Sequence, residues 1–155
     1  MIFALNRLKA ILASLPLLLL ILAFPTHAIS IEPLSEVSPV KVVSFGDVFF
    51  DFNNTALRDS SKEVLQTNAE IIIALKDAVI SIQGHADQRG TTEYNLVLGE
   101  QRAKAVLRYL IAEGVDESKI KTISYGEEQP QCNQNNENCR QQNRRVHFIV
   151  EKLHE

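Results

Sequence analysis

An acidic and a basic side chain, fifteen positions apart, are the residues of this sequence best suited to bind a ligand. Asp87 lies in the glycine-bounded run GHADQRG (residues 84–90), and Arg102 lies in the helical pattern that follows. A guanidinium holds a carboxylate through two parallel hydrogen bonds, and an aspartate accepts hydrogen bonds from an ammonium group. The pair is therefore suited to a zwitterion such as the head group of an amino acid. We interpret the chain as a receptor rather than an enzyme, and we expect no cofactor.

The same two residues also have a structural interpretation. Asp87 could cap the following helix, while Arg102 pairs with Glu93, with Asp87 or with another loop carboxylate. Residue types alone favour this interpretation, because most such charge pairs in proteins are structural. The choice depends on whether both side chains face one cleft.

Residues around the pair fit a cleft. Gly90 allows the backbone to approach a ligand closely. Asn95, in the first helical turn, would bond either the ligand or the loop backbone. Tyr94 and one phenylalanine of the FFDF run, Phe52, are candidates for an apolar wall, whereas the other phenylalanines alternate into the core. One arginine near the last strand could reach the cleft, but a solvated structural role is the safer interpretation for Arg144.

Hydrophobic periodicity predicts the order β-α-β-α-β-β, an α/β two-layer sandwich. A first helix begins near Ser60, which has capping-box spacing to Glu63, and a second ends at Gly114. Two βα crossovers imply parallel neighbouring strands with both helices on one face, and the last strand can return antiparallel, which makes a small mixed sheet. The expected strands are residues 42–52, 78–83, 120–125 and 145–151, and the second helix is residues 92–113. Gly46 and Asp47 could form a bulge or turn inside the first of these strands.

One glycine lies on the apolar face of the second helix. Gly99 lowers helix stability by about 1 kcal/mol relative to alanine. We expect the compensation to be a close approach of the helix backbone to the sheet.

A polar segment precedes the last strand and contains both cysteines. Residues 131–142 are almost wholly Gln, Asn, Glu and Arg, and we expect a long loop there. Cys132 and Cys139 are expected to form a disulfide, because two cysteines in an exported chain most often pair. A metal site would need more ligands, and no histidine lies between the two cysteines.

The first 28 residues have the pattern of a signal peptide. A positively charged start precedes an apolar run, residues 10–24, and small residues end at Ala28. The run is shorter than the roughly 20 apolar residues that span a bilayer, and Pro16 interrupts it. We expect cleavage after Ala28, with a retained anchor as the alternative. An exposed lead-in (29–41) and one domain (42–155) would follow.

Composition excludes several classes of protein. The chain of 155 residues has a net charge of −3 and no basic stripe, so it is a poor candidate for binding nucleic acid or anionic lipid. With 45% hydrophobic residues it is typical of a folded globular domain. No cysteine lies near the expected cleavage site, so we expect no lipid anchor of its own.

At these residues the chain resembles a known family. From about Val48 to Lys152 it is similar to the OmpA-like peptidoglycan-binding domain, and most of all to the branch of peptidoglycan-associated lipoproteins (Pal). Any one matching piece is a weak signal, but together they follow in order and at the right spacing through nearly the whole domain. The pieces are VFFDF (48–52), GHADQRGT (84–91), EYN (93–95), LGEQRA (98–103), YGEEQP (125–130) and NRRV (143–146).

The resemblance implies non-catalytic binding of peptidoglycan through the diaminopimelate residue of its stem peptide. Asp87 would take the ammonium and Arg102 the carboxylate. Asn53 stands where many relatives carry aspartate. The resemblance also implies a mature protein in the periplasm of a Gram-negative bacterium, where partner proteins would provide any outer-membrane association. The other binding residues that it implies are Phe52, Asn53, Gly90, Thr91 and Asn95.

Two alternative functions stay open at this point. The first is an interaction module of a larger envelope complex, of Tol–Pal, secretion or motor type, in which the wall contact positions a partner. The second, less favoured, is a wall hydrolase that uses His85, Asp87 and Glu93. Zinc usually needs three or four ligands, and no Ser or Cys nucleophile has an evident base partner.

Overall fold

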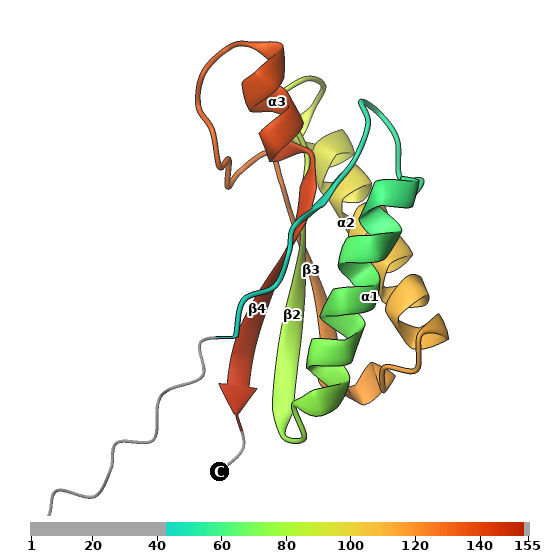
Figure 1. Ribbon diagram of the computed structural model, residues 1–155. Coiled ribbons are helices and arrows are strands. Elements are labelled where there is room, and N and C mark those ends of the chain that lie inside the picture. The colour runs from blue at the N-terminus through green and yellow to red at the C-terminus, as the bar shows by residue number, and fades with distance from the viewer. Residues whose placement is uncertain (1–42, 154–155) are drawn as a thin grey trace, which may run out of the picture. The chain divides into compact units, whose positions relative to one another are not determined.

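A four-stranded mixed sheet carries two long helices on one of its faces (Figure 1). The computed structural model describes residues 43–153. The expected signal peptide (1–28) and lead-in (29–41) lie outside the described residues. No helix within the described range is long and apolar enough to cross a membrane.

The elements follow the predicted order with two short additions, a third helix and a 3-10 turn. Two long helices alternate with the first three strands, and a short third helix precedes the last strand. The strands are β1 (Val48–Phe49), β2 (Ala78–His85), β3 (Ile120–Gly126) and β4 (Arg145–Leu153), and the helices are α1 (Asp59–Ala74), α2 (Thr92–Ala112) and α3 (Glu137–Asn143), with a 3-10 turn at Glu117–Lys119.

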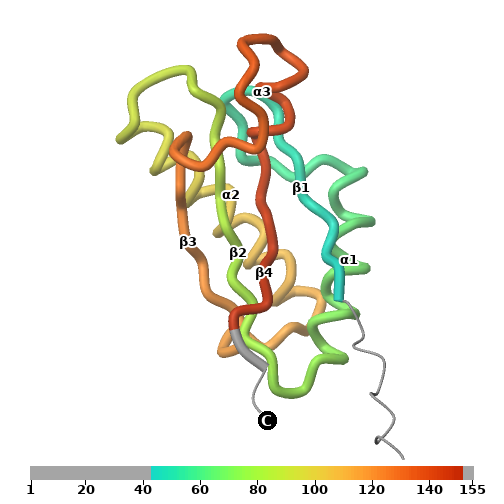
Figure 2. Tube along the Cα trace, turned by 90° about the vertical axis from the view of Figure 1, so that its left-hand side faces the viewer, coloured from blue at the N-terminus to red at the C-terminus, as the bar shows by residue number. Residues whose placement is uncertain are grey.

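The order of the strands in the sheet is β1-β4-β2-β3. β2 and β3 pair in parallel, as the crossover connection predicts, and β4 runs antiparallel to both β1 and β2. Figure 2 shows β4 between β1 and β2 within the sheet. The expectation of parallel neighbours is therefore right for β2 and β3 and wrong for β1, because β4 separates β1 from β2.

The core lies between the sheet and the two long helices. Residues of β2 and β4 that face the helices pair across the strands, for example Ile82 with Phe148. Leu65 and Ile72 lie seven residues apart on α1 and are completely buried, as a helical stripe requires. The other large core side chains are Val48, Phe50, Ile80, Val106, Leu110 and Val146.

Two local predictions at the start of the domain are wrong. The first strand is shorter than residues 42–52, because the backbone of Gly46 bonds a side chain rather than a strand. Its N–H donates to Asn68 Oδ1 (3.0 Å), and its carbonyl accepts from Asn68 Nδ2 (2.8 Å). The Ser60 capping box is also absent, since α1 already begins at Asp59 and its N-cap, Arg58, forms no side-chain cap bond.

Candidate functional site

Three segments meet at one end of the sheet and enclose a pocket of about 190 Å³. They are the β1–α1 connection, the β2–α2 connection with the start of α2, and the end of α3, which lie together at the top of Figure 1. Both residues of the expected charge pair face this pocket. Its lining residues are Phe52, Asn53, Asp87, Arg89, Gly90, Tyr94, Asn95, Leu98, Arg102 and Arg144.

The β2–α2 connection holds Asp87 at the pocket without using it as a helix cap. The Ala86 N–H donates to the Gly126 carbonyl (2.7 Å), so the chain stays attached to β3 just before Asp87. Thr91 is the N-cap of α2, and its hydroxyl accepts from the Tyr94 N–H (3.2 Å). The capping interpretation of Asp87 is therefore wrong. Thr91, expected among the binding residues, does not line the pocket.

Asp87 is buried and accepts four hydrogen bonds. Its Oδ1 accepts from the Arg89 backbone N–H (3.1 Å) and from Arg89 Nε (3.0 Å). Its Oδ2 accepts from Arg89 Nη2 (2.6 Å) and from Arg144 Nη1 (3.0 Å). Burial alone would raise the pKa of Asp87, but the bonds from Arg89 and Arg144 outweigh it and lower the pKa to about 2. The carboxylate is thus ionised at any physiological pH.

Arg102 is the largest completely buried side chain among the described residues. Its guanidinium donates to three backbone carbonyls, those of His85 (2.8 Å), Asp51 (3.0 Å) and Asn54 (3.0 Å). A guanidinium has five N–H donors, so two remain. Burial lowers the pKa of Arg102 to about 10, which leaves it charged at neutral pH.

No carboxylate within residues 43–153 forms an ion pair with Arg102, and the interpretation in which Glu93 pairs with it is wrong. A buried charge without a counter-ion is costly. Because this guanidinium borders the pocket, an anion bound there would be its counter-ion.

Arg144 reaches the pocket, contrary to the solvated role expected for it. Its side chain is 5% exposed, and its Nη1 contacts both Asp87 (3.0 Å) and Glu137 Oε1 (2.9 Å). Its Nη2 donates to Gln141 Oε1 (2.6 Å). Glu137 and Gln141 lie on α3, which the sequence did not predict. The alternative in which one arginine near the last strand reaches the cleft is therefore right for Arg144.

Arg89 is a cation of the pocket that the sequence interpretation missed. Besides its bonds to Asp87, its Nη1 lies 3.5 Å from Glu137 Oε2, and its guanidinium carbon lies 3.8 Å from the centre of the Phe52 ring. Its position two residues after Asp87, in a loop that starts at the end of a strand, was the available signal.

The remaining expected residues form the rim and the support of the pocket. Asn95 Nδ2 donates to the Arg89 carbonyl (3.1 Å) and to Glu127 Oε2 (2.9 Å), so it fixes the loop as well as lining the pocket. The Asn53 side chain accepts from the Tyr94 hydroxyl. Phe52 and Tyr94 are 57% and 49% exposed, which places apolar surface at the mouth of the pocket.

The positive φ values of two lining residues define the turns there. Asn53 has a φ of 51° and Gly90 a φ of 108°. Both fall in the left-handed region, which glycine adopts without strain and asparagine tolerates.

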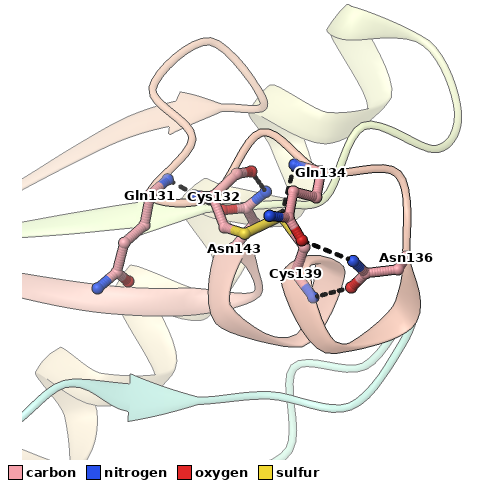
Figure 3. Close-up of a disulfide and its surroundings, with 6 residues drawn as sticks. All are labelled: Gln131, Cys132, Gln134, Asn136, Cys139 and Asn143. Atoms are coloured by element: carbon pink, nitrogen blue, oxygen red, sulfur yellow. Dashed lines mark hydrogen bonds between the residues drawn. A yellow bond between two sulfur atoms is a disulfide. The ribbon is translucent and has the colours of Figure 1, made fainter.

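The disulfide-closed loop supports α3 and therefore Arg144. Cys132 and Cys139 form the predicted disulfide. Figure 3 shows that Asn143 Oδ1 accepts from the N–H groups of Gln131 (2.9 Å) and Cys132 (3.0 Å), while its Nδ2 donates to the Cys132 carbonyl (2.8 Å). At the other end of α3, Asn136 Oδ1 accepts from the Cys139 N–H (2.8 Å). These bonds hold a short polar helix directly before Arg144.

The residues of the hydrolase alternative do not meet in this pocket. His85 and Glu93 are absent from its lining. The His85 ring is buried and stacks on Tyr125, with 5.7 Å between ring centres. Within residues 43–153 no group of three or more His, Cys, Asp or Glu side chains could hold a metal.

The buried ring of His85 predicts a loss of stability in acid. Burial, together with the charges of Arg145 and His147, lowers the pKa of His85 to about 4, from about 6.5 in the unfolded chain. Between these pH values the unfolded state binds more protons than the folded state does. The stability gained by burying the neutral His85 ring is therefore fully present above pH 6.5 and is lost as the pH falls to 4. We expect the free energy of unfolding to decrease by about 2–3 kcal/mol over this range.

Urea unfolding at pH 7, 5.5 and 4 measures this effect. His85→Phe keeps a ring against Tyr125 but cannot be protonated, so its free energy of unfolding should depend less on pH in this range. An equal pH dependence in both proteins would contradict the assignment to His85.

Comparison with known proteins agrees with the fold. A model of the OmpA family matches residues 49–144. The peptidoglycan-associated lipoprotein of Agrobacterium fabrum is 43% identical over 109 residues, which are 70% of this chain and 62% of the relative. That of Pseudomonas putida is 38% identical over 113 residues, 73% of this chain and 66% of the relative. The chain thus spans less than two thirds of the Agrobacterium protein.

Two solved structures are similar to the described domain. The crystal structure of the peptidoglycan-associated lipoprotein from Burkholderia pseudomallei has a TM-score of 0.66 at 37% identity, and the match covers 68% of this chain and 89% of that one. The C-terminal domain of Helicobacter pylori MotB also has a TM-score of 0.66, at 23% identity, covering 70% of this chain and 86% of that one. This second likeness concerns the fold alone. With a family model that matches well over half of its length, the chain belongs to the OmpA family.

Proposed function

We propose that the pocket binds peptidoglycan non-covalently, through the free end of diaminopimelate in the stem peptide. That end carries an ammonium and a carboxylate on one carbon. Arg102 would bind the carboxylate and Asp87 the ammonium, with the apolar mouth formed by Phe52 and Tyr94 against the carbon chain. The protein would act in the periplasm as a non-catalytic tether or sensor of the wall.

The observation that carries the proposal is the buried, unpaired charge of Arg102. Three backbone carbonyls orient the guanidinium, and no carboxylate of residues 43–153 lies close enough to form an ion pair with it, although the charge of Asp87 acts on it through the pocket. A guanidinium held in this way is pre-organised for a carboxylate, because its remaining donors are fixed before the ligand arrives. Asp87 lies in the same small pocket and supplies the opposite charge.

The names of the relatives support the same ligand. The Agrobacterium and Pseudomonas proteins are named as peptidoglycan-associated lipoproteins, and they match this chain over residues that include most of the described domain. We therefore extend association with peptidoglycan to this chain.

Titration with two synthetic stem peptides tests the proposal. One contains diaminopimelate, and the other contains lysine, which has the ammonium but lacks the terminal carboxylate. We expect the diaminopimelate peptide to bind at least about tenfold more tightly, since a hydrogen bond to a charged group is worth about 1.5–3 kcal/mol. Calorimetry measures both affinities, and equal affinities would rule out the proposed role of Arg102.

A further inference from the structure

The acceptor sites of Asp87 are already filled in the structure. A carboxylate offers about four lone-pair sites, and Asp87 uses four of them, three with Arg89 and one with Arg144. An ammonium that binds Asp87 must therefore displace one of these donors. The proposed function thus requires an exchange of partners.

Arg89 is the donor that is able to leave. The Arg144 side chain is 5% exposed and is anchored to Phe50, Gln141 and Glu137 as well as to Asp87. The Arg89 side chain is 35% exposed. Its other contacts are a 3.5 Å approach to Glu137 and the Phe52 ring, and Phe52 is itself mostly exposed.

The side chains around the pocket carry an excess of positive charge, which a ligand without net charge would not neutralise. Three arginines line it, and the carboxylates next to them are Asp87 and, at the edge, Glu137. A zwitterionic head group adds one positive and one negative charge, so it leaves the excess positive charge unchanged. It also separates Arg89 from Asp87, its main counter-ion.

We propose that Arg89 occupies the place of the ligand's ammonium in the free protein and then pairs with a second carboxylate of the bound ligand. This inference rests on the proposed function. It makes Arg89 a specificity-determining residue, and it defines the ligand class as one with two carboxylates and one ammonium. A stem peptide that ends at diaminopimelate has two sources of the second carboxylate, the α-carboxylate of its isoglutamate and the chain-end carboxylate of diaminopimelate, whereas a longer stem has only the first.

Three synthetic tripeptides of alanine, γ-linked glutamate and diaminopimelate distinguish these sources. One is unmodified, one is amidated at the glutamate α-carboxyl, and one is amidated at the chain-end carboxyl. We expect amidation of one of the two groups to weaken binding to the wild-type protein by about ten- to a hundredfold, since it removes a charge-assisted pair.

Arg89→Gln should bind that amidated peptide and the unmodified peptide equally. It should bind the amidated peptide at least as tightly as the wild type does, because the internal competitor for Asp87 is absent. The matched control is Lys104→Gln, which removes the same charge from an exposed α2 residue that pairs with Glu100 outside the pocket lining. This control should keep the full discrimination.

Three outcomes would contradict the inference. Wild-type affinity that is unaffected by both amidations, or discrimination by Arg89→Gln equal to that of the wild type, would overturn the role of Arg89. Both results leave the preference for diaminopimelate over lysine intact, and so leave the proposed function standing. Failure of every tripeptide to bind the wild-type protein would overturn the proposed function and this inference together.

Discussion

Replacing Arg102 with alanine is expected to abolish co-sedimentation of the protein with isolated cell walls and to destabilise the domain. The side chain is completely buried and donates to three backbone carbonyls, one at the end of β2 and two in the β1–α1 connection. Truncation removes one donor from each of these carbonyls, of which the Asp51 carbonyl still accepts from the Asn54 N–H (3.2 Å), and creates a cavity. We expect the free energy of unfolding, measured in urea, to fall by about 3–5 kcal/mol.

Arg102→Lys separates loss of binding from loss of folding. Lysine keeps the positive charge and most of the volume, but its single ammonium cannot hold a carboxylate through two parallel bonds and also satisfy three carbonyls. The circular dichroism of this variant should match that of the wild type, whereas its affinity for the diaminopimelate peptide should fall by tenfold or more. A folded lysine variant with wild-type affinity would contradict the proposed contact in which Arg102 holds the ligand carboxylate through two parallel bonds.

The charge pair could be predicted from the sequence because local patterns define both of its elements. Asp87 lies in a glycine-bounded run that follows an apolar strand. Arg102 belongs to a helix whose first residues and whose end near Gly114 can be recognised in the sequence. A strand and the helix that follows it stay close in a βα unit. The sequence could therefore place the two residues on neighbouring elements, although not their exposure or their hydrogen bonds.

No local sequence pattern predicts the third segment of the pocket, which is α3 with Arg144. Helix α3 is almost wholly polar, so hydrophobic periodicity cannot reveal it, and short helices are marginal without tertiary support. Its support comes from the disulfide and from the amide of Asn143, which bonds residues eleven and twelve positions away. Two of the side-chain partners that enclose Arg144, Glu137 and Gln141, lie on α3. For that reason its solvated role was a wrong prediction.

The position of β4 in the sheet could not be predicted from the sequence either. Alternating apolar residues in β4 predicted a strand with one wet face, and this property does not depend on which strands lie beside it. The short β1 has a similar cause, since the bonds between Gly46 and Asn68 join residues twenty-two positions apart. Long-range partners of this kind leave no periodic pattern.

The predicted close approach of the α2 backbone to the sheet at Gly99 is confirmed. It implies a large loss of stability when a side chain is added at the facing glycine, Gly84. A Cβ atom added at Gly84 of β2 would lie 1.9 Å from the carbonyl oxygen of Gly99 on α2. Contacts of Cβ atoms below 3.0 Å are essentially never observed, and a backbone carbonyl cannot rotate aside as a side chain does. Gly84→Ala therefore has to push α2 away from the sheet.

We expect Gly84→Ala to lower the free energy of unfolding by more than about 4 kcal/mol, or to prevent folding at 37 °C. The matched control is Gly114→Ala at the end of α2, where φ is 93° and an added Cβ meets nothing within 4 Å. That control measures backbone strain alone, about 1–2 kcal/mol. Urea unfolding of both variants measures the difference, and equal stability would mean that α2 does not pack on β2 at this distance. Because Asp87 follows β2 and Arg102 lies on α2, any variant that separates these two elements should also lose the peptide-binding pocket.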